Sequence, residues 1–145
     1  MSFAIEKEIE AAEFYEEASG QENFSGTRDV LIEFAQEERK HQRLLEALSD
    51  EAEEQLEAYD FQWVPDLKRS DHMVEMAYQP GMHYVDLLRL AMKREEVALR
   101  LYNKLAAETE KESHIRLFRM LSQEEAKHKQ FLEALFDDYM AEVGD

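Results

Sequence analysis

Two Glu-x-x-His triplets are the residues in this sequence best suited to chemistry, and they run from Glu38 to His41 and from Glu125 to His128. Residues three apart share a helix face, so the carboxylate and imidazole of a triplet can hold one metal ion together. A single triplet is weak evidence, because a chain this rich in Glu contains one by chance. The repetition of the triplet at a fixed spacing is the stronger signal.

An internal repeat relates the two triplets. A shift of 87 positions aligns their surroundings without a gap, and nine of the fifteen positions in 34–48 are identical to their partners in 121–135. The same shift pairs Glu8 with Glu95, and each lies 30 residues before the Glu of its triplet. We interpret the chain as two copies of one helical hairpin, each with a Glu on its first helix and a Glu-x-x-His on its second.

Four amphipathic segments must position these residues. Apolar residues recur every three or four positions, and only 4 Gly and 2 Pro interrupt the 145 residues, which favours long helices. The first expected helix ends near Ser19, and a turn over 20–26 follows, with Thr27 as the cap of the second helix. The third helix begins just after Pro80-Gly81, and the fourth follows a turn at 111–113.

The middle of the chain connects the two hairpins. The hairpins cover residues 1–48 and 81–145, and the 49–80 connection is too long for a hairpin turn, so we expect it to cross the bundle and make the second and third helices parallel. Part of it, 66–78, is predicted to be helical. Its Trp63 and methionines most simply cover the bundle or a homodimer contact. The fold class is therefore an all-α four-helix bundle in one domain, 1–145.

The spacing puts the four carboxylates at one level of the bundle. Glu8 lies 12 residues before Gly20 and Glu38 lies 12 residues after Gly26, and the second hairpin shows the same spacing. Helix residues rise about 1.5 Å each, so these positions have equal height. The triplets also continue the apolar stripes of their helices, so their side chains should point inward.

Buried carboxylates at one level need positive charge. Burial and mutual repulsion oppose the ionisation of four such acids. Two divalent cations match the four carboxylates, and His41 and His128 supply one nitrogen to each ion. Mixed oxygen and nitrogen donors favour iron first and manganese second.

The amino-acid composition argues against several other classes of protein. With 34 acidic and 17 basic residues the net charge is −17, which repels nucleic acid and anionic membranes. The chain has no Cys, so disulfides, Cys-ligated metals and thiol nucleophiles are excluded for these residues. The first residues lack a basic leader and no segment reaches the roughly 20 apolar residues of a membrane span, so we expect a cytoplasmic protein.

Simpler interpretations of these glutamates and histidines are also open. The four glutamates could be solvated, and the two histidines could be core residues paired with carboxylates. Tyr15 and Tyr102 lie two turns from Glu8 and Glu95, where they could donate hydrogen bonds, relay electrons or only pack. Four glutamates off the pattern are expected to be solvated or hydrogen-bonded to a ligand: Glu37, Glu46, Glu124 and Glu133. The other histidines, His72, His83 and His114, are expected in loops or at helix ends.

The sequence resembles the ferritin-like superfamily, and within it the stand-alone rubrerythrin-like di-iron proteins. The residues that carry the resemblance are Glu8 with Tyr15, Glu38-Arg39-Lys40-His41, Glu95 with Tyr102, and Glu125-Ala126-Lys127-His128. The resemblance implies that Glu38 and Glu125 bridge two ions, that Glu8 and Glu95 are terminal ligands, and that each histidine binds one ion. It also implies reaction with hydrogen peroxide or dioxygen.

Two departures from the resemblance shape the functional hypothesis. Rubrerythrins carry a cysteine-rich rubredoxin domain, so electrons for this cysteine-free chain are expected from an external donor protein. They also tend to carry another Glu where this chain has Ala98. We therefore predict a di-iron oxidoreductase that uses peroxide or dioxygen; a ferroxidase or iron-handling protein and a metal-stabilised non-catalytic bundle are the alternatives.

Overall fold

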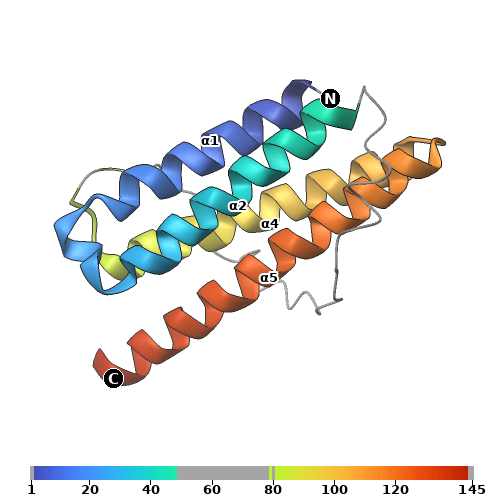
Figure 1. The fold of residues 1–145 in the computed structure, drawn as a ribbon. Coiled ribbons are helices and arrows are strands. Elements are labelled where there is room, and N and C mark those ends of the chain that lie inside the picture. Colours follow the sequence, from blue (N-terminus) through green and yellow to red (C-terminus); the bar gives the residue numbers. More distant parts are fainter. Residues whose placement is uncertain (1, 49–78, 80, 144–145) are drawn as a thin grey trace.

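The structure is a computed structural model that describes residues 2–48, 79 and 81–143, and every structural statement below concerns these residues. Four long helices form a bundle, as predicted (Figure 1). The elements are α1 (Ser2–Ser19), the 3-10 helix η1 (Glu22–Thr27), α2 (Arg28–Ala47), α4 (Tyr84–Glu108) and α5 (Glu112–Val143). The described ranges contain no strand.

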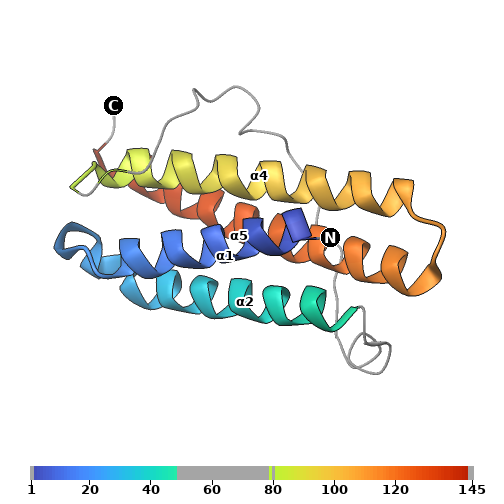
Figure 2. The same cartoon turned by 90° about the horizontal axis from the view of Figure 1, so that it is seen from above.

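The helices are arranged as two antiparallel hairpins. The pair α1 and α2 packs side by side, and so does the pair α4 and α5 (Figure 2). The colours in Figure 2 show that α2 and α4 run in the same direction, which confirms the prediction for the second and third helices. The predicted crossover 49–80, with its expected helix at 66–78, lies outside the described residues except for Gln79.

Local sequence explains where the helices begin. Gly81 has a φ of +84°, a left-handed conformation that glycine adopts readily, and α4 starts three residues later. Thr27 is the N-cap residue of α2, as predicted, although its side chain makes no capping hydrogen bond. The Thr27 hydroxyl instead donates a hydrogen bond to the carbonyl of Phe24 at 3.1 Å, because the preceding turn is a 3-10 helix that offers an acceptor.

Two apolar clusters form the core, one toward each end of the bundle. The first surrounds Tyr15, Phe34 and Leu88, and the second surrounds Leu45 and Leu121. Burial of such side chains contributes roughly 1.5–3 kcal/mol each to folding. The level between the two clusters is polar, and it is the level that the carboxylate spacing predicts.

In the described helices, no stretch is both long and apolar enough to cross a membrane.

Candidate metal centre

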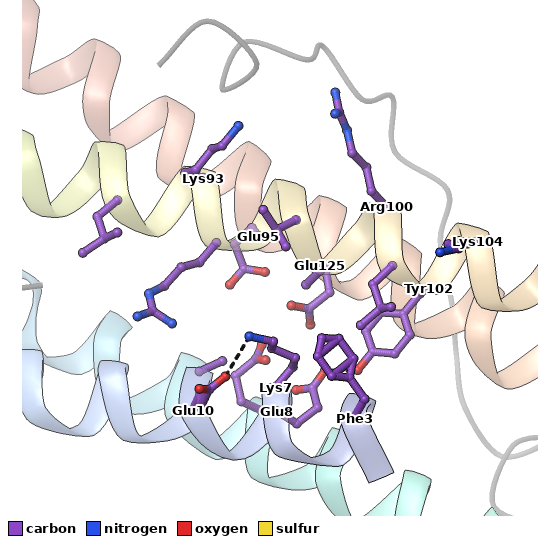
Figure 3. A pocket seen from close by; sticks show the side chains of 17 residues that line it. Phe3, Lys7, Glu8, Glu10, Lys93, Glu95, Arg100, Tyr102, Lys104 and Glu125 are labelled. Carbon is purple, nitrogen blue, oxygen red and sulfur yellow. Dashed lines mark hydrogen bonds and ion pairs between the residues drawn. The ribbon is translucent and has the colours of Figure 1, made fainter. Parts of the chain in front are cut away.

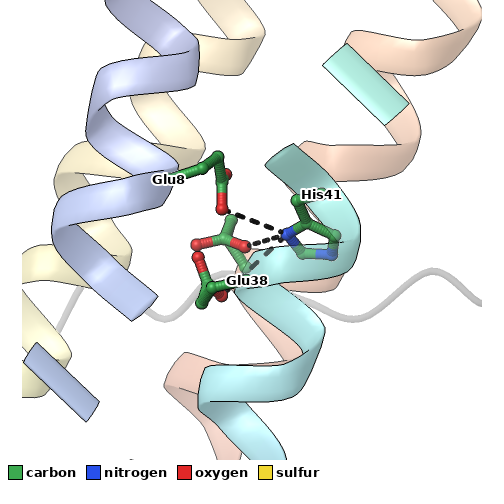
Figure 4. Close-up of side chains that lie close together, drawn as sticks. Glu8, Glu38 and His41 are labelled. Atoms are coloured by element: carbon green, nitrogen blue, oxygen red, sulfur yellow. Dashed lines mark ion pairs between the residues drawn. The ribbon is translucent and has the colours of Figure 1, made fainter. Parts of the chain in front are cut away.

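Six acidic and imidazole side chains meet in the middle of the bundle, and each is at most 3% exposed. Every helix contributes, and the residues are Glu8 from α1, Glu38 and His41 from α2, Glu95 from α4, and Glu125 and His128 from α5. Figure 4 shows Glu8, Glu38 and His41 turned toward one another. The structure thus brings together all six residues that the sequence nominated, and leaves none of them on the surface.

The six residues fall into two overlapping groups. Each group offers four ligand atoms that lie within 4.8 Å of one another. The groups are Glu8, Glu38, His41 and Glu125, and Glu38, Glu95, Glu125 and His128. Glu38 and Glu125 belong to both, so the arrangement can hold two neighbouring cations that share two carboxylates.

Each imidazole of the cluster contacts one glutamate of its own hairpin and one of the other hairpin. His41 Nδ1 lies 2.9 Å from Glu125 Oε1 and 3.5 Å from Glu8 Oε2. At the equivalent positions of the repeat, His128 Nδ1 lies 3.0 Å from Glu38 Oε1 and 3.5 Å from Glu95 Oε1. The matching distances show that the sequence repeat is also a repeat in the geometry of the cluster.

Seven buried atoms of the cluster make no hydrogen bond of acceptable geometry, although several lie within ion-pair distance of one another. They are Glu8 Oε2, both oxygens of Glu38, His41 Nδ1, Glu95 Oε2, Glu125 Oε1 and His128 Nδ1. Buried polar atoms are normally paired, and leaving one unpaired costs about 1–3 kcal/mol. All seven face the same small volume, so the donor set fits a pair of cations, which would satisfy them together.

The electrostatics of the cluster show how strongly it needs positive charge. Burial raises the pKa of Glu38 and of Glu125 well above the usual range, and the neighbouring carboxylates add to this shift. Burial would lower the pKa of His128, but the charge of Glu95 and the hydrogen bond with Glu37 raise it well above normal. Cations that bind here therefore displace protons.

Two tyrosines hold the outer oxygens of the glutamates. Tyr15 Oη donates to Glu95 Oε1 at 2.5 Å, and Tyr102 Oη donates to Glu8 Oε1. Burial, followed by the charge of the contacted glutamate, raises the pKa of Tyr15 and of Tyr102 well above normal, so both remain protonated donors. Each tyrosine thereby fixes the orientation of a carboxylate on the opposite hairpin.

One imidazole has additional partners that the sequence pattern left open. His128 Nε2 makes a hydrogen bond with Glu37, and the ring of Phe34 stacks on His128 at a centroid distance of 4.2 Å. The hydrogen bond with His128 lowers the pKa of Glu37. A carboxylate on the second nitrogen of an imidazole ligand fixes its tautomer and raises its basicity.

The remaining off-pattern glutamates differ from one another. Glu46 is exposed, and Glu124 pairs with Lys127 at 3.8 Å. Glu133 is only 5% exposed, so the solvated position considered for it is wrong. The face of α5 that carries Glu133 is covered by the bundle, which the helical period alone did not show.

The other histidines lie at helix ends. His83 immediately precedes α4, and His114 lies in the first turn of α5 with its ring edge-on to Phe118. Both positions agree with the helix-end prediction. His72 lies outside the described residues.

Sequence reasoning missed a buried ion pair next to the cluster. Lys129 Nζ donates to Glu96 Oε2 at 2.7 Å, and the two residues are 1% and 0% exposed. Arg100 Nε lies 2.7 Å from the other oxygen of Glu96. The counterparts of Glu96 and Lys129 in the repeat are the uncharged Ile9 and Gln42, so the paired appearance of opposite charges was the available signal.

Comparison with known proteins agrees with this geometry. The family profile described as Rubrerythrin matches residues 1–136. No curated protein and no solved structure shows a significant match. The family match spans both hairpins and all six residues of the cluster.

Proposed function

This chain belongs to the rubrerythrin family of di-iron carboxylate proteins, and we propose that it is a non-haem di-iron oxidoreductase that reduces hydrogen peroxide and also reacts with dioxygen. The observation that carries the proposal is the set of seven buried atoms without a hydrogen bond on six residues, arranged in two groups that share Glu38 and Glu125. Two iron ions match this donor set in number, charge and ligand type.

Each residue has a role in the proposed centre. Glu38 and Glu125 would be shared by the two ions, because they belong to both groups. Glu8 and His41 complete one ion, and Glu95 and His128 complete the other. Iron is favoured over manganese as the resident metal, and metal analysis decides between them.

The bound ferrous ions supply two electrons for cleavage of the peroxide O–O bond, which also consumes two protons and releases water. The chain would hold the ions among buried side chains at the middle of the bundle and orient Glu95 and Glu8 through Tyr15 and Tyr102. An external donor protein returns the electrons, because these 145 residues contain no Cys for an iron–sulfur relay.

Metal analysis followed by peroxide titration tests the proposal. The protein as purified should contain about two iron ions per chain. The reduced protein should consume hydrogen peroxide rapidly under anaerobic conditions, and over many turnovers when a reductant is present. A single oxidation followed by no turnover with a competent reductant would contradict an enzymatic role.

The same experiment separates the two alternatives. A ferroxidase would consume ferrous iron and dioxygen and release or store ferric iron. A metal-stabilised bundle would bind metal without reacting with either oxidant. A chelator should lower the melting temperature in all three cases, because bound metal stabilises the folded state by mass action, so this measurement shows binding but not function.

The homodimer and the cytoplasmic location stay predictions. Analytical ultracentrifugation of the metal-loaded protein would show whether a dimer forms, and a large shell would favour iron storage instead.

A further inference from the structure

A cavity of about 410 Å³ lies between α1 and α4 and reaches the metal-binding cluster. Its inner end is formed by the carboxylates Glu8, Glu38, Glu95 and Glu125. Figure 3 shows Glu8, Glu95 and Glu125 pointing into the space between the two helices. The cavity is therefore a route from the surface to the four acids.

The cavity is much larger than hydrogen peroxide requires. A water molecule takes about 30 Å³ of liquid volume, and hydrogen peroxide has only two heavy atoms. The volume of 410 Å³ instead falls in the range of pockets that bind small organic molecules, about 300–1,000 Å³. Size alone thus leaves room for a substrate with an organic group.

The walls of the cavity carry apolar side chains among the charged ones. They include Phe3 and Ala11 from α1 and Leu90, Val97, Ala98 and Leu101 from α4. Phe3 is 53% exposed and Val97 is 48% exposed, although both are large hydrophobic residues. Exposed apolar residues that gather at an opening are typical of a binding groove for an apolar ligand.

Two of the basic residues around the opening are paired with glutamates. Lys7 Nζ pairs with Glu10 at 3.2 Å, and Arg100 Nε lies 2.7 Å from Glu96. Arg94 lies over the ring of Phe14 at 4.7 Å. Figure 3 also shows Lys93, Arg100 and Lys104 directed away from the cavity. Arg94 Nε is buried without a hydrogen-bond partner, but the four carboxylates at the inner end repel an anion, so a neutral ligand is favoured.

We propose that the cavity binds an apolar organic hydroperoxide, with its alkyl or aryl group between α1 and α4 and its peroxide group at the four carboxylates. The inference rests on the proposed function and specifies its substrate class. Cleavage of the O–O bond takes two electrons from the two ferrous ions and two protons, and yields one alcohol and one water. The external donor then reduces the two ferric ions.

A change in substrate preference tests the inference. The value of kcat/KM is measured for cumene hydroperoxide and for hydrogen peroxide in the iron-loaded protein. Ala98→Leu adds a larger side chain to the cavity wall and should lower the ratio of the first value to the second by at least about tenfold. The matched control Ala134→Leu adds the same side chain on an exposed position of α5, and its ratio should stay within about twofold of the original.

A binding measurement supplies a second readout that needs no redox reaction. Cumyl alcohol, the product of cumene hydroperoxide reduction, should bind to protein loaded with redox-inactive Zn²⁺ and give a calorimetric signal. Ala98→Leu should weaken this binding by a similar factor, and Ala134→Leu should leave it unchanged. Ala11→Leu tests the opposite wall if Ala98→Leu fails to fold.

The outcomes distinguish the inference from the proposed function. Turnover of hydrogen peroxide without turnover of cumene hydroperoxide would overturn the inference and leave the proposed function standing. An unchanged substrate ratio in both cavity variants would also overturn it. Failure to turn over either peroxide would overturn the proposed function and, with it, this substrate class.

Discussion

The two hairpins have the same ligands but different surroundings. The first hairpin, α1 and α2, and the second, α4 and α5, place Glu, Glu and His at equivalent positions with nearly equal distances. Around these residues the repeat diverges. The comparison indicates that the geometry of the cluster is the constrained part of the repeat, whereas the residues that support it are free to differ.

The difference is clearest at the two imidazoles. His128 has Glu37 on its second nitrogen and Phe34 stacked on its ring. The counterparts of Glu37 and Phe34 in the repeat are Glu124, which pairs with Lys127, and Leu121. The two proposed ion positions are therefore chemically unequal, although their candidate ligands are of the same types.

The largest expected effect comes from the glutamates that the two groups share. Glu38→Gln weakens both ion positions, so bound metal should fall well below about one ion per chain, whereas Glu8→Gln affects one position and should leave about one ion. Elemental analysis after gel filtration measures this difference. Equal metal content in the two variants would show that Glu38 does not serve both ions.

The buried ion pair of Lys129 with Glu96, whose counterparts in the repeat are Gln42 and Ile9, should contribute strongly to stability. Lys129→Met leaves Glu96 buried with Arg100 as its remaining charged neighbour, which should cost about 2–4 kcal/mol of unfolding free energy. The counterpart Gln42→Met should cost less than about 1 kcal/mol. Urea denaturation of both variants compares the hairpins, and similar costs would mean that the ion pair contributes no more than its uncharged counterpart.

Glu37, the hydrogen-bond partner of His128, should affect metal affinity at one ion position more than at the other. Glu37→Ala removes the acceptor on His128 Nε2 and should weaken metal binding at that position by about tenfold. Glu124→Ala, the matched change in the other copy, should alter affinity by less than about twofold. Metal titration resolves the two binding steps. A larger effect from Glu124→Ala would reverse the proposed asymmetry.

The smallest effects on stability are expected at Tyr15 and Tyr102, which occupy equivalent positions in the two hairpins. Tyr15→Phe and Tyr102→Phe each remove one hydrogen bond to a glutamate of the opposite hairpin. Each should lower the unfolding free energy of the metal-free protein by about 1–2 kcal/mol, and by similar amounts. Thermal denaturation measures both. Clearly unequal losses would extend the asymmetry of the imidazoles to the tyrosines.

The sequence predicted the parts of the molecule that follow from helical period and repetition. The inward direction of Glu38 and Glu125 and the parallel course of α2 and α4 are of this kind. These features depend on spacing along one helix or on the length of a connection. Such quantities can be counted in the sequence.

Features that depend on how helices pack against one another could not be predicted. Lys129 carries a charge and suggests a surface position, yet Glu96 on the neighbouring helix makes its burial possible. The contact of Glu37 with His128 joins α2 to α5 across the bundle. The cavity likewise depends on the separation of α1 and α4, which no pattern within either helix encodes.

The crossed tyrosines have a consequence for the repeat. Tyr15 serves an acid of the second hairpin and Tyr102 serves an acid of the first. A mutation that removes one tyrosine hydroxyl therefore removes a hydrogen bond from a glutamate in the other half of the repeat. Loss of either tyrosine would leave a glutamate of the other hairpin without its hydrogen-bond donor, so the two halves of the repeat support each other.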